Sequence, residues 1–186
     1  MPKLQLSVAM GDYDRTRALF DGTVQIDGVE PTYMLLSPEE MFFRAFRFRD
    51  FDICELSLSS YLVKHAGGNC PYIAIPVFLS RAFRHTAMYV RKDRIRRPED
   101  LKGKRIGVPE YQLTANVWAR SILADDHGVQ PQDVTWVRGG IDQPGRAEKI
   151  ELKLPDGVVM VNAPADTTIS DPVSYTHLTL PTIYSV

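Results

Sequence analysis

The sequence has few cysteines, no long apolar run and no excess of either charge. Only two of its 186 residues are cysteine, Cys54 and Cys70, which is too few for a disulfide scaffold. No apolar run approaches the roughly 20 residues that span a bilayer. The formal net charge is −1, from 22 basic and 23 acidic residues. This balance does not favour nucleic acid or an acidic membrane surface as a partner.

Signals for export, nucleotide binding and metal binding are also missing. Residues 1–8 alternate polar and apolar side chains as a strand does, without the charged start, apolar block and cleavage site of a secretory signal. If Met1 is the true start, we expect a cytoplasmic protein. The sequence contains no phosphate loop, GxGxxG, GxSxG or HExxH motif, and the spacing of His65, His85 and His127 does not favour a metal site.

What the sequence does contain is an alternation of strand and helix patterns. Strand patterns occur at residues 4–8, 22–29 in part, 31–36, 51–54, 71–78, 86–91, 104–108 and 134–137. Helices are predicted up to Phe20 with Asp12 or Asp14 as cap, from Ser37, from Ser57 or Ser59 to Ala66, at residues 97–101, and from Ala115 to Gly128. This order predicts an α/β fold with a largely parallel sheet.

Polar residues cluster where the predicted strands end, at residues 11–15, 55–60, 80–85, 110–116 and 138–140. Ligands of open α/β sheets bind beyond the carboxyl ends of the strands, where helix N-termini attract anions. The alternative is that these side chains only cap their helices. The candidate binding residues are Asp12, Tyr13, Glu55, Ser57, Ser59, Tyr111, Gln112, Thr114 and Arg138.

Among these segments, residues 81–85, Arg-Ala-Phe-Arg-His, indicate a function most specifically, because two arginines and a histidine occur within five residues. Arginine binds carboxylates in a bidentate way, and histidine titrates near neutral pH and can deliver a proton. In a strand-like geometry Arg81 and His85 share one side, while Arg84 faces the other. The alternative is a surface crossover between two lobes.

Two longer segments resemble a known family. Residues 75–85, Ile-Pro-Val-Phe-Leu-Ser-Arg-Ala-Phe-Arg-His, and 98–112, Pro-Glu-Asp-Leu-Lys-Gly-Lys-Arg-Ile-Gly-Val-Pro-Glu-Tyr-Gln, resemble the 4,5-dihydroxyphthalate decarboxylase family. Residues 100–104 alone are similar to type 2 solute-binding proteins at large. The resemblance covers residues 1–172 and implies a two-lobed, type 2 periplasmic-binding-protein-like fold with the ligand cleft between its lobes. Residues 1–92 would form the first lobe, and residues 93–172 a second lobe whose C-terminal part is missing.

The resemblance also implies an activity, the decarboxylation of 4,5-dihydroxyphthalate to a dihydroxybenzoate and CO2. Such a reaction needs cations for the carboxylates, a base for a hydroxyl and an acid near the ring carbon. It demands no cofactor, because the hydroxyl supplies the electrons. We expect Arg81 and Arg84 to bind carboxylate, His85 to act as acid or base, and Glu110 or Glu55 to orient a hydroxyl. The alternative is a solute-binding protein of an ABC transporter for a small carboxylate or aromatic acid, and assembly into a homo-oligomer stays open.

The last residues differ from the rest of the chain. Residues 173–182, Val-Ser-Tyr-Thr-His-Leu-Thr-Leu-Pro-Thr, match the translation of a common transposon-end sequencing adapter. We therefore expect residues 173–186 to be foreign, the native sequence to stop near Pro172, and the fragment to be inactive. A genuine apolar strand is the alternative. On the first interpretation His177 is neither a ligand nor a catalyst.

Overall fold

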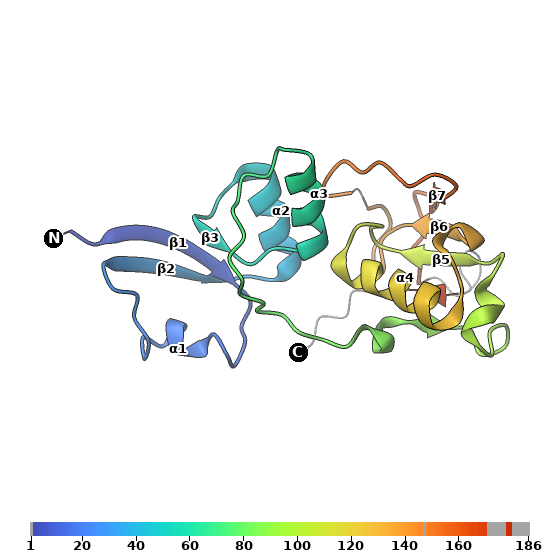
Figure 1. The fold of residues 1–186 in the computed structure, drawn as a ribbon, viewed down its shortest axis with the longest axis horizontal. Coiled ribbons are helices and arrows are strands. Elements are labelled where there is room, and N and C mark those ends of the chain that lie inside the picture. Colours follow the sequence, from blue (N-terminus) through green and yellow to red (C-terminus); the bar gives the residue numbers. More distant parts are fainter. Residues whose placement is uncertain (1, 147, 171–177, 180–186) are drawn as a thin grey trace. The chain divides into compact units, whose positions relative to one another are not determined.

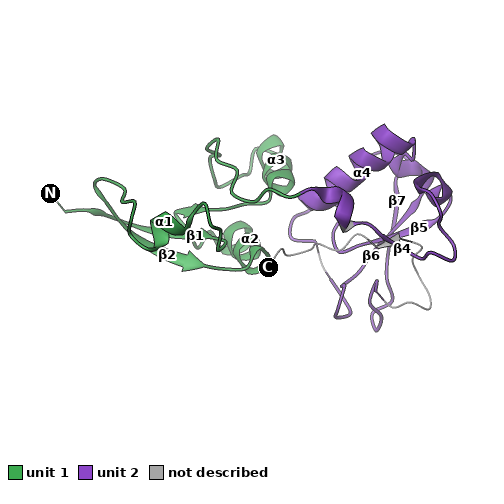
Figure 2. Cartoon of the chain, turned by 90° about the horizontal axis from the view of Figure 1, so that it is seen from below, with its two compact units in different colours: residues 1–82 green, residues 83–186 purple. Residues whose placement is uncertain are grey.

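The computed structural model describes residues 2–146, 148–170 and 178–179, and it divides into two compact units (Figure 1). Residues 1–82 form the first unit and residues 83–186 the second (Figure 2). Each unit has its own sheet, built mainly from parallel strands. The predicted α/β fold with parallel sheets is therefore confirmed, while the lobe boundary near residue 92 stays a prediction.

The sheet of the first unit has three parallel strands in the order β2-β1-β3. The central strand β1 (Leu4–Met10) pairs along its whole length with β2 (Val29–Leu35), and its end pairs with the short β3 (Ile53–Cys54). The burial of β1 increases toward its carboxyl end, where Val8, Ala9 and Met10 are buried. That end of the sheet therefore lies against the core of the unit.

Three helices belong to the first unit: α1 (Arg17–Phe20), α2 (Pro38–Phe48) and α3 (Leu58–Ala66). As predicted, Ser37 begins α2, and its hydroxyl accepts a hydrogen bond from the Glu40 amide. Met41 and Ala45 on one face of α2 are fully buried and pack with Ala9 and Phe51. This apolar cluster holds α2 against β1.

Two local predictions in this unit are wrong. The N-cap of α1 is Thr16 and not Asp12 or Asp14, because the turn after β1 is longer than the sequence suggested. Residues 22–28 form bends and turns instead of a short strand, although Gly28 does adopt the left-handed conformation expected of an Asp-Gly turn (φ 73°).

The predicted strand at residues 71–78 is also wrong. This apolar segment bends at Pro71 and Pro76 and has no strand among the described residues to pair with. Its side chains point outward: Ile73 is 93% exposed, Ile75 65% and Val77 57%. A β-branched sequence can be extended by preference, but it becomes a strand only where a neighbour supplies hydrogen bonds.

The second unit contains a five-stranded sheet in the order β4-β8-β5-β6-β7. Strands β5 (Arg105–Val108), β6 (Thr135–Arg138) and β7 (Val159–Asn162) are parallel and in register, so that Val108, Arg138 and Asn162 end them side by side. The predicted strand at 86–91 shrinks to β4 (Tyr89–Val90), because Arg84–Ala87 forms a short 3-10 helix, η1.

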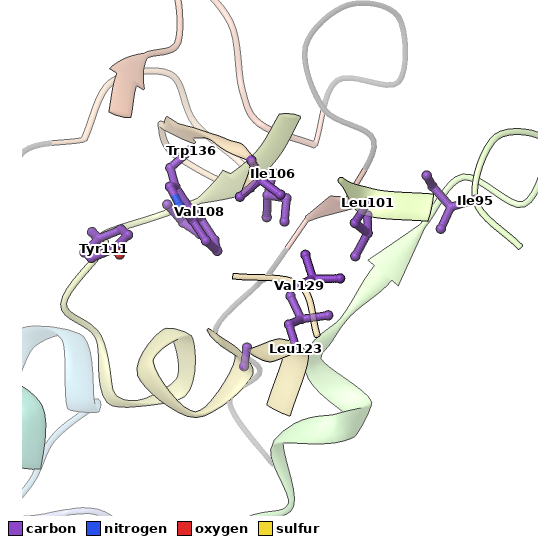
Figure 3. Packing of buried hydrophobic residues seen from close by; sticks show 10 residues of the cluster. Ile95, Leu101, Ile106, Val108, Tyr111, Leu123, Val129 and Trp136 are labelled. Atoms are coloured by element: carbon purple, nitrogen blue, oxygen red, sulfur yellow. The ribbon is translucent and has the colours of Figure 1, made fainter. Parts of the chain in front are cut away.

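The core of the second unit lies between this sheet and α4 (Thr114–His127) (Figure 3). Ile106, Val108 and Trp136 from the strands pack with Ala119 and Leu123 from the helix. The helix ends at Gly128 with φ 63°, as predicted. The short 3-10 helices η2 (Pro98–Leu101) and η3 (Pro131–Asp133) lead into β5 and β6, and Leu101 joins the core.

No helix within the described part of the chain is both long and apolar enough to cross a membrane. The predicted foreign segment, residues 173–186, lies outside the described residues except for Leu178–Thr179. These two residues form β8, which pairs with β4 and β5. The foreign origin of the segment stays a prediction.

Candidate functional site

In the first unit, Tyr13 and Glu55 meet beyond the carboxyl ends of β1 and β3. The Tyr13 hydroxyl lies 3.0 and 3.1 Å from the two carboxyl oxygens of Glu55, and the Gly11 amide donates to Oε2 over 3.3 Å. A Cβ at Gly11 would lie 2.7 Å from the Tyr13 ring, so a side chain there would displace the phenol from its present position. Both residues were predicted at strand ends, and the structure brings them together.

Burial changes the acidity of both partners. It raises the pKa of Glu55 above its ordinary value of 4.5, while the hydrogen bonds from Gly11 and Tyr13 and the nearby Arg15 partly oppose the rise. Burial and the charge of Glu55 also raise the pKa of Tyr13. A carboxyl group with a raised pKa next to a phenol is suited to taking up and releasing a proton.

The predicted polar residues around this pair have local partners. Ser57 is buried and is the N-cap residue of α3; its hydroxyl lies 3.3 Å from those of Ser59 and Ser60. Asp12 is exposed and lies 3.7 Å from the Arg17 guanidinium. The serines are therefore close to Glu55 in sequence and in the fold, whereas Asp12 faces solvent.

The segment of residues 81–85 differs from its prediction. Arg81 is exposed and donates to the carbonyl of Phe78, and Arg84 and His85 begin η1 instead of continuing a strand. The proposed strand-like alternation of Arg81, Arg84 and His85 is therefore wrong. His85 is exposed and makes no hydrogen bond or ion pair with the described residues. Its role as acid or base stays a prediction.

In the second unit, Glu110 lies in the turn between β5 and α4 and is fully buried. Its Oε1 accepts from Arg146 Nε and Nη2 (2.9 and 2.5 Å) and from Lys149 Nζ (2.6 Å). Its Oε2 accepts from the Gln112 amide (2.9 Å) and the Lys149 backbone N–H (3.1 Å). Two cations and an amide thus occupy this carboxylate, so the geometry favours an anchor for the 146–149 loop over contact with a substrate.

A second carboxyl group, Glu148, lies in the same loop. Its Oε1 accepts from the Tyr111 backbone N–H over 3.1 Å and lies 3.8 Å from Arg138 Nη1. Its Oε2 is buried without a hydrogen-bond partner in the described part of the chain. Burial, followed by the charge of Glu110, raises the pKa of Glu148, while the Tyr111 N–H, Arg138 and Lys149 lower it.

The remaining predicted residues of this unit have structural contacts. Tyr111 is 5% exposed, with its ring under the Arg120 guanidinium (3.7 Å to the centroid) and edge-on to Trp136. Gln112 is buried against Glu110, and Thr114 is the first residue of α4. Arg138 is 20% exposed and donates from Nε to the Asn162 side chain over 3.0 Å. Of these residues, Arg138 combines a charged group with access to solvent.

No pattern in the sequence indicated the residues that organise this region, which are Arg120, Arg146, Glu148, Lys149 and Asn162. Residues 146, 148 and 149 lie outside helices and strands, in a segment whose sequence has neither helical nor strand periodicity, so no pattern indicated their burial. The sequence offered only an indirect indication that these charged residues are buried. Three of them precede the apolar Ile150, and their spacing does not match one exposed face of a helix or strand. Within the described residues, no group of three or more His, Cys, Asp or Glu side chains is placed to hold a metal ion.

The sequence of both units was compared with models of known protein families, and one family model matches. Residues 62–147 match the model described as NMT1/THI5 like. The molecule is therefore an α/β protein of this periplasmic-binding-protein-like class.

Two curated relatives narrow the class. The chain is 67% identical over 172 residues to a 4,5-dihydroxyphthalate decarboxylase of Comamonas testosteroni, and 66% identical over 171 residues to one of Pseudomonas putida. These matches cover 92% and 91% of this chain but 52% and 66% of the relatives. The chain belongs to the 4,5-dihydroxyphthalate decarboxylase family, and it spans about half to two thirds of the length of these relatives.

Proposed function

We propose that the protein is a carboxy-lyase that converts 4,5-dihydroxyphthalate to 3,4-dihydroxybenzoate and CO2. The observation that carries this proposal is the identity of 67% and 66%, over nine tenths of the chain, to two proteins named for that reaction. The described residues supply groups of the kind the chemistry needs, namely a proton-accepting carboxyl group and partly exposed arginines.

The chemistry starts at the ring hydroxyl para to the departing carboxylate. A base removes the hydroxyl proton, and the oxygen electrons enter the ring while the carbon that bears the carboxylate takes up a proton. The bond to the carboxylate then breaks, its electrons restore the aromatic ring, and CO2 leaves. The base returns its proton to the oxygen, so that the reaction consumes one solvent proton at the ring carbon. The substrate itself provides the electron pair.

Glu55 is the base that the first unit supports best. Its carboxyl group is the acceptor of the Tyr13 phenol, so a substrate hydroxyl could take the place of that phenol and donate to the same oxygen. The raised pKa of Glu55 brings it closer to the operating pH than an ordinary glutamate, which improves general-base catalysis. Arg81, Arg84 and His85 remain the proposed carboxylate-binding and acid groups; Arg81 and His85 are exposed, and Arg84 is partly exposed.

The test is a product assay with two substrates. Residues 1–172 are joined to the C-terminal part of the Comamonas testosteroni relative, because the 186-residue chain alone is expected to be inactive. This completed protein and the relative are incubated in parallel with 4,5-dihydroxyphthalate, and CO2 and 3,4-dihydroxybenzoate are measured. We expect both products from 4,5-dihydroxyphthalate and none from phthalate, which lacks the hydroxyl that feeds the ring. Saturable binding of 4,5-dihydroxyphthalate without CO2 release, while the relative is active, would overturn the proposal and favour a solute-binding function.

A further inference from the structure

Arg138 ends β6 at a position where the sheet itself orients its guanidinium. The register places Val108, Arg138 and Asn162 in one row at the carboxyl ends of β5, β6 and β7. Within that row the Asn162 side-chain oxygen accepts from Arg138 Nε over 3.0 Å. Because successive residues of a strand alternate between faces, Arg138 shares its face with Trp136, against which α4 packs.

Unlike Nε, the terminal nitrogens of Arg138 do not donate a hydrogen bond to a described residue. The nearest carboxyl oxygen, Glu148 Oε1, lies 3.8 Å from Nη1, which is beyond hydrogen-bond distance, and this oxygen already accepts from the Tyr111 N–H. Among the described residues, no acceptor is within hydrogen-bond distance of Nη1 or Nη2. The side chain is held at one end, and the edge that can bind a carboxylate through two N–H groups remains available.

The charge around Arg138 also favours an anion. Arg138, Arg146 and Lys149 carry three positive charges, and Glu110 and Glu148 carry two negative charges when both are ionised. The charge of Glu110 is balanced by its close contacts with Arg146 and Lys149, at 2.5 and 2.6 Å. Arg138 and Glu148 form a longer ion pair, at 3.8 Å. Burial further disfavours the charged form of Glu148, which increases the excess of positive charge beside Arg138.

We propose that Arg138 binds a carboxylate of an aromatic acid at the carboxyl end of β6, with Asn162 as its positioning residue. This inference deepens the proposed function, on which it rests, by assigning the carboxylate that is retained in the product to Arg138. Glu148 Oε1, which lies 3.8 Å from Nη1, is the carboxyl oxygen with which a bound carboxylate would share the Arg138 guanidinium. The ligand class is a ring carboxylate, and phthalate serves as a probe because it has the carboxylates without the reactive hydroxyls.

The experiment measures phthalate affinity of the 186-residue chain by isothermal titration calorimetry. Arg138→Met should weaken binding by roughly 10- to 100-fold, because a charged hydrogen-bonding partner is lost. Asn162→Ala should weaken it by about 3- to 10-fold, as expected for one positioning hydrogen bond. Arg94→Met is the matched control: it removes the same charge from an exposed position of the same unit and should leave the affinity unchanged.

Arg138→Lys keeps the charge, so it tests the site even if the methionine variant does not fold. It should bind more weakly than the unsubstituted chain, because a lysine cannot form the bidentate pair. The affinity of the unsubstituted chain should fall as salt increases, and that dependence should be smaller in Arg138→Met. In turnover, Asn162→Ala should raise KM and leave kcat nearly unchanged.

Failure of this inference can be told apart from failure of the proposed function. Phthalate binding that depends on Arg138, without CO2 release from 4,5-dihydroxyphthalate, would keep the site and remove the decarboxylase activity. Turnover with a KM unaffected by Arg138→Lys and Asn162→Ala would keep the activity and overturn the site. An unsubstituted chain that does not bind phthalate, or an equal loss in Arg94→Met, would also overturn the site.

Discussion

Glu55 in the first unit and Glu110 in the second occupy similar places in the chain, since each follows a parallel strand and precedes a helix. Their surroundings differ. Glu55 accepts hydrogen bonds from a phenol and a peptide N–H, whereas Glu110 is fully buried and accepts from Arg146, Lys149 and Gln112. The Glu110 carboxylate is bound by two cations, Arg146 and Lys149, and holds their loop in place. The Glu55 carboxyl group, beside the Tyr13 phenol and with a raised pKa, can take up and release a proton during a reaction.

The largest effect expected from this contrast is on stability. Glu110→Gln would leave Arg146 and Lys149 in a buried site without their counter-charge, and breaking such a pair costs about 3–5 kcal/mol. Urea unfolding measures the loss. The control Glu151→Gln, at an exposed glutamate of the following segment, should change the free energy of unfolding little. Equal stabilities of the two variants would show that the Glu110 network contributes nothing.

Glu55→Gln should act on turnover instead. Replacing a general base by an amide lowers kcat by roughly 100-fold or more, while the free energy of unfolding should change far less than in Glu110→Gln. Initial rates of CO2 release measure the effect. Glu30→Gln, an exposed carboxyl group at the other end of the strands, is the control and should retain the full rate. A Glu55→Gln protein with an unchanged kcat would remove Glu55 from the mechanism.

Tyr13→Phe should give a smaller change of the same kind. The hydroxyl donates to Glu55, and its loss costs about 1–2 kcal/mol of stability. Because that hydrogen bond lowers the pKa of Glu55, its removal should raise this pKa further and move the acid limb of the pH–rate profile to higher pH. A profile that does not move would mean that the phenol does not control the proton on Glu55.

The smallest effect is on the pH dependence of stability. The folded pKa of Glu55 lies above its ordinary value of 4.5, so the folded state binds more protons than the unfolded state between these two values. Stability should therefore fall as pH rises through this window and then stay level. Glu55→Gln should make the fall shallower, with the remainder due to Glu148, which is shifted in the same direction. Unfolding free energies from pH 4 upward measure it, and identical slopes would contradict the shift.

The sequence patterns predicted many helix ends and strands correctly, because these features depend on residues that are close together in the chain. The cap at Ser37, the stop at Gly128 and the apolar strands β1, β5 and β6 depend on neighbours within a few residues. The meeting of Tyr13 and Glu55 could be anticipated as well, because parallel strands end at the same edge of a sheet.

The failures share a physical cause. Residues 71–78 have strand composition, but strand formation depends on a pairing partner that composition does not reveal. The burial of Arg146, Glu148 and Lys149 likewise depends on a loop folding back over 36 to 39 residues onto Glu110 and Tyr111. Those contacts are set by tertiary structure, which a periodicity search within one segment does not detect.

The turn that follows Arg138 limits how this sequence can vary. A side chain at Gly140 would collide with the carbonyl oxygen of Gln143, so any substitution would require residues 140–145 to take another path. That path leads directly to Arg146 and the loop that surrounds Glu110. In evolutionary terms, Gly140 and the loop after it form a single unit of variation, and a change at Gly140 should be tolerated only with compensating changes in residues 141–149.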